Sequence, residues 1–319
     1  MTSVFRGVVV ALVAGVFLVT QNGINTALKE AAIPSPVATA LLSFSVSTVA
    51  IGAVATAHRP DYDFALAGAP WYAYCGGLLG AGYVFGAVYL TSQLGFAVFT
   101  LCMILGQVLV SLALDITGFL QPHRRVPSWQ RLVALCGVFS GTALIMEHVG
   151  SDLEGRPPWV TANLLVGAIV SGSGMPIQAL LNGVMTKHLG TPFRASTVSF
   201  AGGTLVLGAL ALATGGIGEL HLGSSSPWMW TGGLCGALAI TGNIIGVAEL
   251  GAAAYSAIFV STQLLAAFVF DVIGAFGFDP VEASRRRLLG VLLAAGSAVA
   301  YQMAPSTIEP KPDAAGALI

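Results

Sequence analysis

The sequence predicts an all-α polytopic membrane protein with ten transmembrane helices, built as two inverted five-helix repeats. Three observations predict this fold. Only 8% of the 319 residues are charged and 55% are hydrophobic, whereas a soluble domain carries about 25% charged residues. Long stretches without any charged residue recur along the chain. The second half of the chain also repeats residues of the first half in register.

The composition excludes several other classes of protein. Intrinsic disorder requires low hydrophobicity and high net charge, and nucleic-acid binding requires a basic surface, but the formal net charge here is −1. A transmembrane β-barrel needs short segments that alternate in polarity, whereas the apolar stretches of this chain are continuous. A helical protein whose outer surface faces lipid remains.

Each predicted span is a charge-free stretch of about 20 residues, the length that crosses about 30 Å of hydrocarbon as a helix. Between Asp63 and Asp115 the stretch is 51 residues long, so it holds two spans and a tight turn near 91–95. Between Arg131 and Glu147 it is 15 residues long, and Trp129 at the interface extends it. In chain order the predicted spans are 5–27, 36–57, 70–91, 95–115, 129–147, 160–182, 194–214, 228–248, 251–272 and 286–304.

An internal duplication appears as matching residues at offsets of 156 and 157. A glycine-rich block that begins at Gly76 matches one at Gly232. The chain therefore divides into a first repeat (1–148), a linker (149–159), a second repeat (160–304) and a disordered tail (305–319). The polar matches are Gln21 with Gln178, Asn25 with Asn182, Gln107 with Gln263, Asp115 with Asp271 and Arg131 with Arg287.

Five spans in each repeat make the second repeat enter the membrane from the opposite side. Inverted repeats of this kind occur in secondary transporters, whose substrate sites lie between the repeats near the bilayer midplane. Lys and Arg accumulate in cytoplasmic loops. With a cytoplasmic N-terminus, eight of the 13 Lys and Arg residues lie inside and five outside. We expect an integral protein of the plasma (inner) membrane with both termini cytoplasmic.

Polar residues within the spans are the candidate site residues, because placing them in lipid is costly. Gln21 and Asn25 share one face of the first span, and Gln178 and Asn182 repeat that face in the sixth. Inversion would bring the two faces together. There the amides could bind a small polar solute, join the two helices, or do both. The further candidates for substrate binding are Asn22, Gln107, Gln263 and Asn243.

Pro176 lies two residues before Gln178 and frees the carbonyl group of Gly172. The sixth helix is therefore expected to bend, either as a broken helix beside the site or as a tolerated kink.

The charged residues near the span ends suggest two roles. Asp115 and Asp271 end the fourth and ninth spans, so we expect structural ion pairs with Arg131 and Arg287 of the following spans. Glu249 lies near the turn between the eighth and ninth spans, and its counterpart in the first repeat is the neutral Gln93. Glu249 is the candidate for coupling transport to protons, and sodium is the other candidate coupling ion.

Nothing in the sequence predicts a catalytic residue, a metal site or a cofactor. Four cysteines fall inside predicted spans without CxxC or Cys/His spacing. The chain also has no P-loop, GxSxG or HExxH motif. The cysteines are Cys75, Cys102, Cys136 and Cys235.

Two blocks of sequence carry a family resemblance, Trp71–Gly80 and Leu105–Asp115, with weaker second copies in Trp230–Leu234 and Thr262–Asp271. Through these blocks the chain resembles the YdcZ-like branch of the drug/metabolite transporter superfamily, in a fused form of its five-helix unit. The resemblance implies ten helices and a central cavity lined by spans 1, 3, 4, 6, 8 and 9. It also implies movement of small metabolites or drugs across the inner membrane.

One feature departs from the superfamily. Its small multidrug exporters use a membrane-embedded Glu in the first span to exchange protons for cations. The first and sixth spans here contain no carboxylate, so antiport of cationic drugs against protons is disfavoured.

The expected function is secondary-active transport, and export rather than import, of a small polar metabolite or drug by alternating access. The expected partners are that solute, a coupling ion and the lipid bilayer, with no nucleic acid, for a monomer or homodimer that is not an enzyme. The alternative is a non-transporting membrane scaffold or assembly partner, in which the amides would bond to each other in a dry interface. A channel would need a continuous polar stripe along one repeat, which no span shows.

Overall fold

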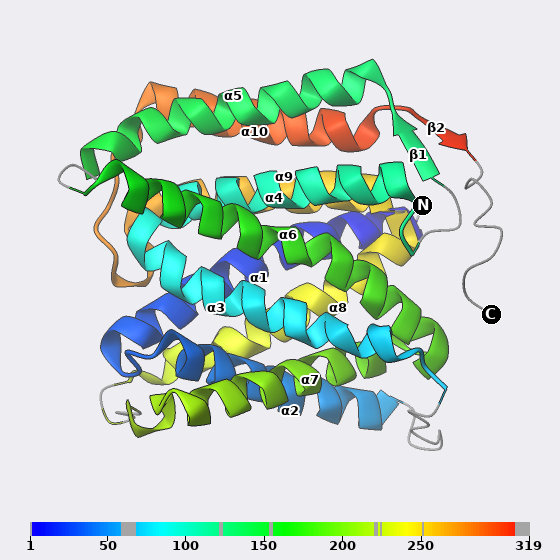
Figure 1. The fold of residues 1–319 in the computed structure, drawn as a ribbon, viewed down its shortest axis with the longest axis vertical. Coiled ribbons are helices and arrows are strands. Elements are labelled where there is room, and N and C mark those ends of the chain that lie inside the picture. The colour runs from blue at the N-terminus through cyan, green and yellow to red at the C-terminus, as the bar shows by residue number, and fades with distance from the viewer. Residues whose placement is uncertain are drawn as a thin grey trace.

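The computed structural model describes residues 2–58, 68–120, 124–152, 156–219, 223, 225–250 and 252–309. Most of these residues belong to ten α-helices that lie side by side across the long axis of the molecule (Figure 1). The helices are α1 (Thr2–Ala31), α2 (Pro36–His58), α3 (Gly76–Leu94), α4 (Phe96–Thr117), α5 (Trp129–Asp152), α6 (Pro158–Leu189), α7 (Pro192–Ala213), α8 (Gly232–Leu250), α9 (Ala252–Ile273) and α10 (Arg285–Met303). Short 3₁₀ turns are η1 (Trp71–Cys75), η2 (Gly216–Glu219), η4 (Pro227–Thr231) and η5 (Ala275–Gly277).

Each predicted span coincides with one α-helix, and local signals explain the ends. Pro158 and Pro192 begin α6 and α7, where a missing N–H costs nothing. Gly118 and Gly190 follow α4 and α6 in the left-handed conformation, which favours glycine and closes a helix. The spans predicted at 70–91 and 228–248 each begin with a 3₁₀ turn before the α-helix.

Length and apolarity show an all-α polytopic membrane protein. Among the described residues, eight helices are long and apolar enough to cross a membrane. The other two are α5, whose apolar part is the shorter segment Trp129–Ile145, and α10, which begins with three consecutive arginines. The eight are α1 to α4 and α6 to α9.

The helices of each repeat pack mainly on helices of the other repeat. In the first repeat α1 packs on α8 and α9, and its counterpart α6 packs on α3 and α4. The pairs α2–α7 and α5–α10 each join a helix to its own counterpart. They lie at the bottom and at the top of Figure 1. Between α2 and α7, Phe44 lies 5.2 Å from Phe200 and Thr48 Oγ1 lies 3.0 Å from Thr204 Oγ1. Both contacts join residues related by the 156-residue offset.

Both of these pairs run antiparallel. At one end of the α5–α10 pair Gly137 lies against Ser297, and further along α5 Ile145 lies against Gly290, which is earlier in α10. Near its C-terminus α2 brings Gly52 to Thr197 of early α7. The same antiparallel pairing of a helix with its counterpart therefore occurs on both sides of the helix bundle.

The segments outside the helices differ from two predictions. The predicted linker 149–159 is shorter, because α5 continues to Asp152 and α6 begins at Pro158; residues 153–155 lie outside the described residues. The prediction of a disordered tail from Pro305 is wrong for β2 (Ser306–Glu309). This strand pairs antiparallel with β1 (Arg124–Pro127), whose backbone supplies its hydrogen-bond partners. Residues 310–319 lie outside the described residues.

Candidate functional site

The amides of α1 lie in a tightly packed interface. The side-chain nitrogens of Gln21 and Asn25 both donate to Ser43 Oγ of α2, at 3.2 and 3.0 Å. Gly236 and Gly232 of α8 lie directly over them, and a methyl group at either glycine would collide with the amide. Both amides are buried, so they fasten α1 to α2 beneath the glycine face of α8.

The amides of α6 occupy the equivalent place in the other repeat. Gln178 lies against Gly80 of α3, and Asn182 lies against Gly76. The two amide faces therefore turn toward different helices, and the prediction that they meet each other is wrong. Repeat symmetry makes them equivalent without placing them in contact, and none of the four lines the cavity described below.

Two other predicted candidates are also buried away from that cavity. Asn22 donates to the Tyr83 hydroxyl at 2.9 Å and so joins α1 to α3. Gln263 of α9 is fully buried. Its amide nitrogen donates to Phe259 O at 3.4 Å, and its Oε1 has no hydrogen-bond partner among the described residues.

A cavity of about 300 Å³, half of whose lining residues are polar, lies between α4, α5, α6, α8, α9 and α10, with β1 at its edge. It reaches from Pro176 in the middle of α6 to Asp115 in the last turn of α4, at the end of the bundle where β1 and β2 lie (Figure 1). Two predicted site residues, Gln107 and Asn243, line it. The helices implied by the family resemblance are only partly those observed, because α1 and α3 contribute no lining residue and α5 and α10 do. The polar lining residues are Gln107, Ser111, Asp115, Arg125, Arg131, Asn243, Ser256, Tyr301 and Gln302.

The structure forms both predicted ion pairs. Arg131 Nη1 lies 2.7 Å from Asp115 Oδ2, and Arg287 Nη2 lies 2.9 Å from Asp271 Oδ2. The Arg131 guanidinium also donates to the carbonyl oxygen of Ala304 at 3.3 Å, and so ties α5 to the end of α10. The first pair borders the cavity, whereas the second is buried on both sides.

Glu249 lies in the last turn of α8, where Arg6 Nε of α1 donates to its Oε1 at 2.6 Å. The Arg6 side chain is 69% exposed and the Glu249 side chain 10%. Glu249 is absent from the cavity lining, although Val247 two residues earlier is part of it. The residue therefore sits at the rim of the same end of the bundle.

Sequence reasoning missed five polar lining residues, which are Ser111, Arg125, Ser256, Tyr301 and Gln302. Matching between repeats could not point to Arg125 or Tyr301, because their counterparts are Val281 and Ile145. The available signal for Tyr301 and Gln302 was two adjacent polar groups in the last turn of the tenth span.

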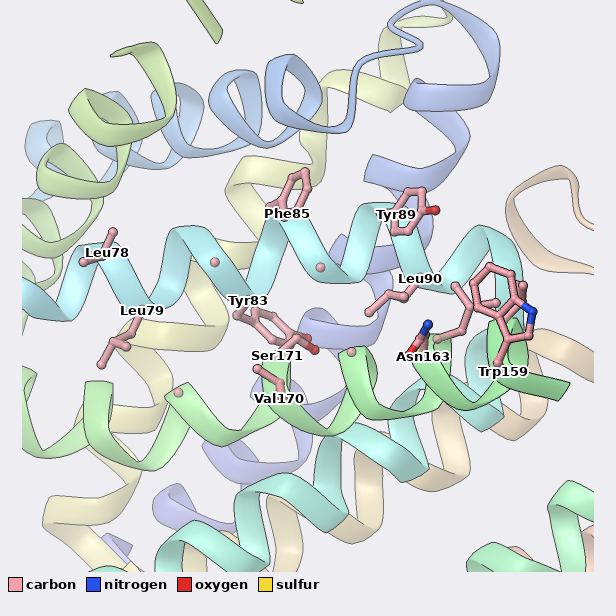
Figure 2. Close-up of a pocket in the computed structure, with 16 residues that line it drawn as sticks. Leu78, Leu79, Tyr83, Phe85, Tyr89, Leu90, Trp159, Asn163, Val170 and Ser171 are labelled. Atoms are coloured by element: carbon pink, nitrogen blue, oxygen red, sulfur yellow. The ribbon is translucent and has the colours of Figure 1, made fainter. Parts of the chain in front are cut away.

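A second hollow lies on the side of the bundle. Figure 2 shows this groove of about 560 Å³ between α3 and α6, where Tyr83, Asn163 and Ser171 add polar groups to a largely apolar lining. A groove of the same volume lies between α1 and α8, where Leu234 and Gly242 replace Leu78 and Gly86. Both repeats therefore carry this lateral groove, while the central cavity lies at the end of the bundle that holds β1 and β2.

These features define a polytopic membrane protein with a polar cavity that reaches the middle of its helix bundle. Residues 7–144 and 163–300 each match the family described as "Putative inner membrane exporter, YdcZ". The chain belongs to this family, in a fused form with two repeats. No curated protein matches the chain. It is accordingly an integral inner-membrane protein, and its family is one of membrane transporters rather than enzymes.

Proposed function

We propose that this protein is a secondary-active transporter that exports a small polar solute through the central cavity by alternating access. In this proposal all ten helices cross the membrane, the repeats are inverted, and both termini are cytoplasmic. The antiparallel pairs α2–α7 and α5–α10 support the inversion. A two-fold axis perpendicular to the helices makes a helix run antiparallel to its counterpart where the axis passes between them.

The observation that carries the proposal is the difference between the cavity and its repeat counterpart. Gln107, Ser111 and Ser256 line the cavity, whereas their counterparts Gln263, Ala267 and Thr100 are almost fully buried. The counterparts of Asp115, Arg131, Asn243 and Tyr301 are buried as well. These are Asp271, Arg287, Ala87 and Ile145, none of which is more than 5% exposed.

Two buried atoms lie in the region that corresponds, by repeat matching, to the cavity. They support a conformational change in which this region opens and the present cavity closes. Thr91 Oγ1 and Gln263 Oε1 have no hydrogen-bond partner among the described residues, and such an atom costs about 1–3 kcal/mol. If the second repeat adopts the packing of the first, these positions take the places of Val247 and Gln107 on the cavity wall. Water or solute would then reach both atoms.

The proposed direction, export, rests on the family description and on the end of the bundle at which the cavity lies. The cavity is at the end of the bundle that holds Arg6, Arg131 and Ala304, near both ends of the described part of the chain. Since the excess of Lys and Arg in loops favours cytoplasmic termini, this cavity would load from the cytoplasm.

The test uses a variant without native cysteines, reconstituted in liposomes. Ser111→Cys lines the cavity, and its counterpart Ala267→Cys is its matched control. Without solute, a membrane-impermeant thiol reagent should label position 111 about tenfold faster than position 267, the ratio for an opening cost of about 1.4 kcal/mol. A transported solute should reduce the ratio of the two labelling rates, because it populates the conformation in which position 267 is accessible.

Two results would contradict alternating access. One is a labelling ratio that no solute changes, although flux of that solute is measured. The other is absence of counterflow for amino acids, amines and organic acids alike, which would favour the scaffold alternative.

A further inference from the structure

The charges that line the central cavity do not cancel. Asp115 and Arg131 neutralise each other at 2.7 Å, and Asp115 is the only carboxylate among the described residues that line the cavity. Arg125 of β1 is a second lining guanidinium, with no ion-pair partner among the described residues. The cavity therefore presents one uncompensated positive charge.

The cavity wall also offers a buried hydrogen-bond donor that has no partner among the described residues. Tyr301 is 2% exposed, it lines the cavity, and its hydroxyl has no hydrogen-bond partner among the described residues. The ring of Tyr301 is held in place by the Arg131 guanidinium, 5.4 Å from its centroid. The Asn243 amide adds further donors at the inner end, and Gln107 Nε2, which donates to Met103 Sδ, has a second N–H group. A buried hydroxyl without a partner is costly, and a bound acceptor would remove that cost.

We propose that the cavity recognises a small solute with a single negative charge carried by a carboxylate, bound by Arg125 and hydrogen-bonded by Tyr301. This inference rests on the proposed function and names its substrate class. The planar guanidinium fork matches a carboxylate with two parallel hydrogen bonds. A free amine on the solute would find only Asp115, which is already paired. At about 300 Å³, the cavity lies at the lower limit of small-molecule sites, so the solute is small.

The repeats make this recognition one-sided. The counterparts of Arg125 and Tyr301 are Val281 and Ile145, so the opposite end lacks the guanidinium and the hydroxyl. A carboxylate would be bound more tightly from the end near the termini and released more easily at the other end. This asymmetry agrees with loading from the cytoplasm.

Binding and transport are measured separately on the full chain. Thermal unfolding in detergent is followed with lactate, succinate, alanine, ethanolamine and glycerol, because a ligand raises the midpoint according to its affinity. Counterflow of the same probes is measured in liposomes. Lactate should give the largest stabilisation. Arg125→Gln should weaken lactate binding about tenfold or more, as expected for loss of a charge-assisted bidentate bond.

Three further variants separate recognition from folding. Arg125→Lys keeps the charge and should retain part of the lactate binding. Tyr301→Phe removes only the unpartnered hydroxyl and should weaken lactate binding without lowering the midpoint of the free protein. Arg285→Gln makes the same charge change at an exposed position at the start of α10, and should leave lactate binding unchanged.

The outcomes distinguish this inference from the proposed function. Lactate binding that depends on Arg125, without counterflow, supports recognition and contradicts transport. Stabilisation and counterflow by succinate, alanine, ethanolamine or glycerol in preference to lactate overturns the substrate class and leaves transport standing. Absence of stabilisation by every probe, or lactate binding that survives Arg125→Gln, also overturns the substrate class.

Discussion

Asp115 and Asp271 are repeat counterparts that have different surroundings. The Asp271 carboxylate accepts the backbone N–H groups of Phe96 and Ala97, both at 2.9 Å, and so caps the N-terminus of α4. With Arg287 it forms a pair in which both side chains are 5% exposed. The Asp115 side chain is 17% exposed and borders the cavity. The Asp271–Arg287 pair is therefore buried at one end of the bundle, whereas the equivalent Asp115–Arg131 pair lines the cavity at the other end.

An aromatic cluster accompanies the sealed end. Phe96 packs edge-on against Phe270 and Phe278, and Phe276 lies 5.1 Å from Phe270. Phe276 adopts a left-handed backbone conformation, with φ of 61°, that costs a bulky residue about 1–3 kcal/mol. Its counterpart Leu120 has the same conformation, with φ of 56°, so both ends have the same backbone turn but only one has the aromatic plug.

The two repeats therefore share the contacts that hold their helices together, but equivalent residues differ in how accessible they are. The ion pair, the left-handed turn and the glycine–amide contacts recur in both repeats, while accessibility does not. Two nearly equivalent halves in different packing states are what alternating access requires. The predictions below test whether the two ends differ as described.

The largest difference should come from removing the carboxylates. Asp271→Ala leaves the Arg287 guanidinium buried without a counter-charge and removes the cap of α4, so we expect a loss of about 3–5 kcal/mol. Asp115→Ala should cost about 1–2 kcal/mol, because the Arg131 guanidinium, although as buried as that of Arg287, lines the cavity, where water can take the place of the lost carboxylate. Thermal unfolding in detergent compares the two variants. Equal losses would show that the two ends are equally dry.

The second prediction concerns a feature in which the two repeats agree. A methyl group at Gly80 would collide with Gln178 Nε2, and one at Gly236 would collide with Gln21 Nε2. Gly80→Ala and Gly236→Ala should each cost about 1–3 kcal/mol through overpacking. Gly82→Ala is the control, because nothing lies within 4 Å of a methyl group there. Unfolding midpoints that fall in only one repeat, or that fall equally for Gly82→Ala, would contradict this packing.

The sequence predicts the helices well because charge-free length and end signals are local properties. It also predicts the Asp–Arg pairs, which the repeats preserve. It fails where tertiary placement decides. Gln21 and Gln178 are repeat counterparts, yet they pack against different helices, α8 and α3, because α1 packs mainly on α8 and α9 whereas α6 packs mainly on α3 and α4. Tyr301 has no polar counterpart, so no repeat pattern could reveal it.

A smaller effect is expected at Gln263, whose Oε1 is buried without a partner. Gln263→Met keeps the length of the side chain and removes the unsatisfied oxygen. It should therefore stabilise the closed end by about 1 kcal/mol and slow counterflow. Gln107→Met, at the cavity wall, is the matched control and should not raise the unfolding midpoint. A destabilised Gln263→Met protein would show that the buried amide is satisfied.

The smallest effect is expected at Glu249, which has an ion-pair partner in Arg6 at the open end but the neutral counterpart Gln93 at the closed end. Ion pairs with an exposed partner contribute little, and Glu249 does not line the cavity. Glu249→Gln should change the counterflow rate by less than about threefold and leave its dependence on pH unchanged. Asp115→Asn is the comparison, because it removes the carboxylate that does line the cavity. The opposite result is a pH dependence of counterflow that flattens in Glu249→Gln and persists in Asp115→Asn. It would place proton coupling at Glu249, at the rim of the bundle, and would mean that the two ends also differ in proton coupling.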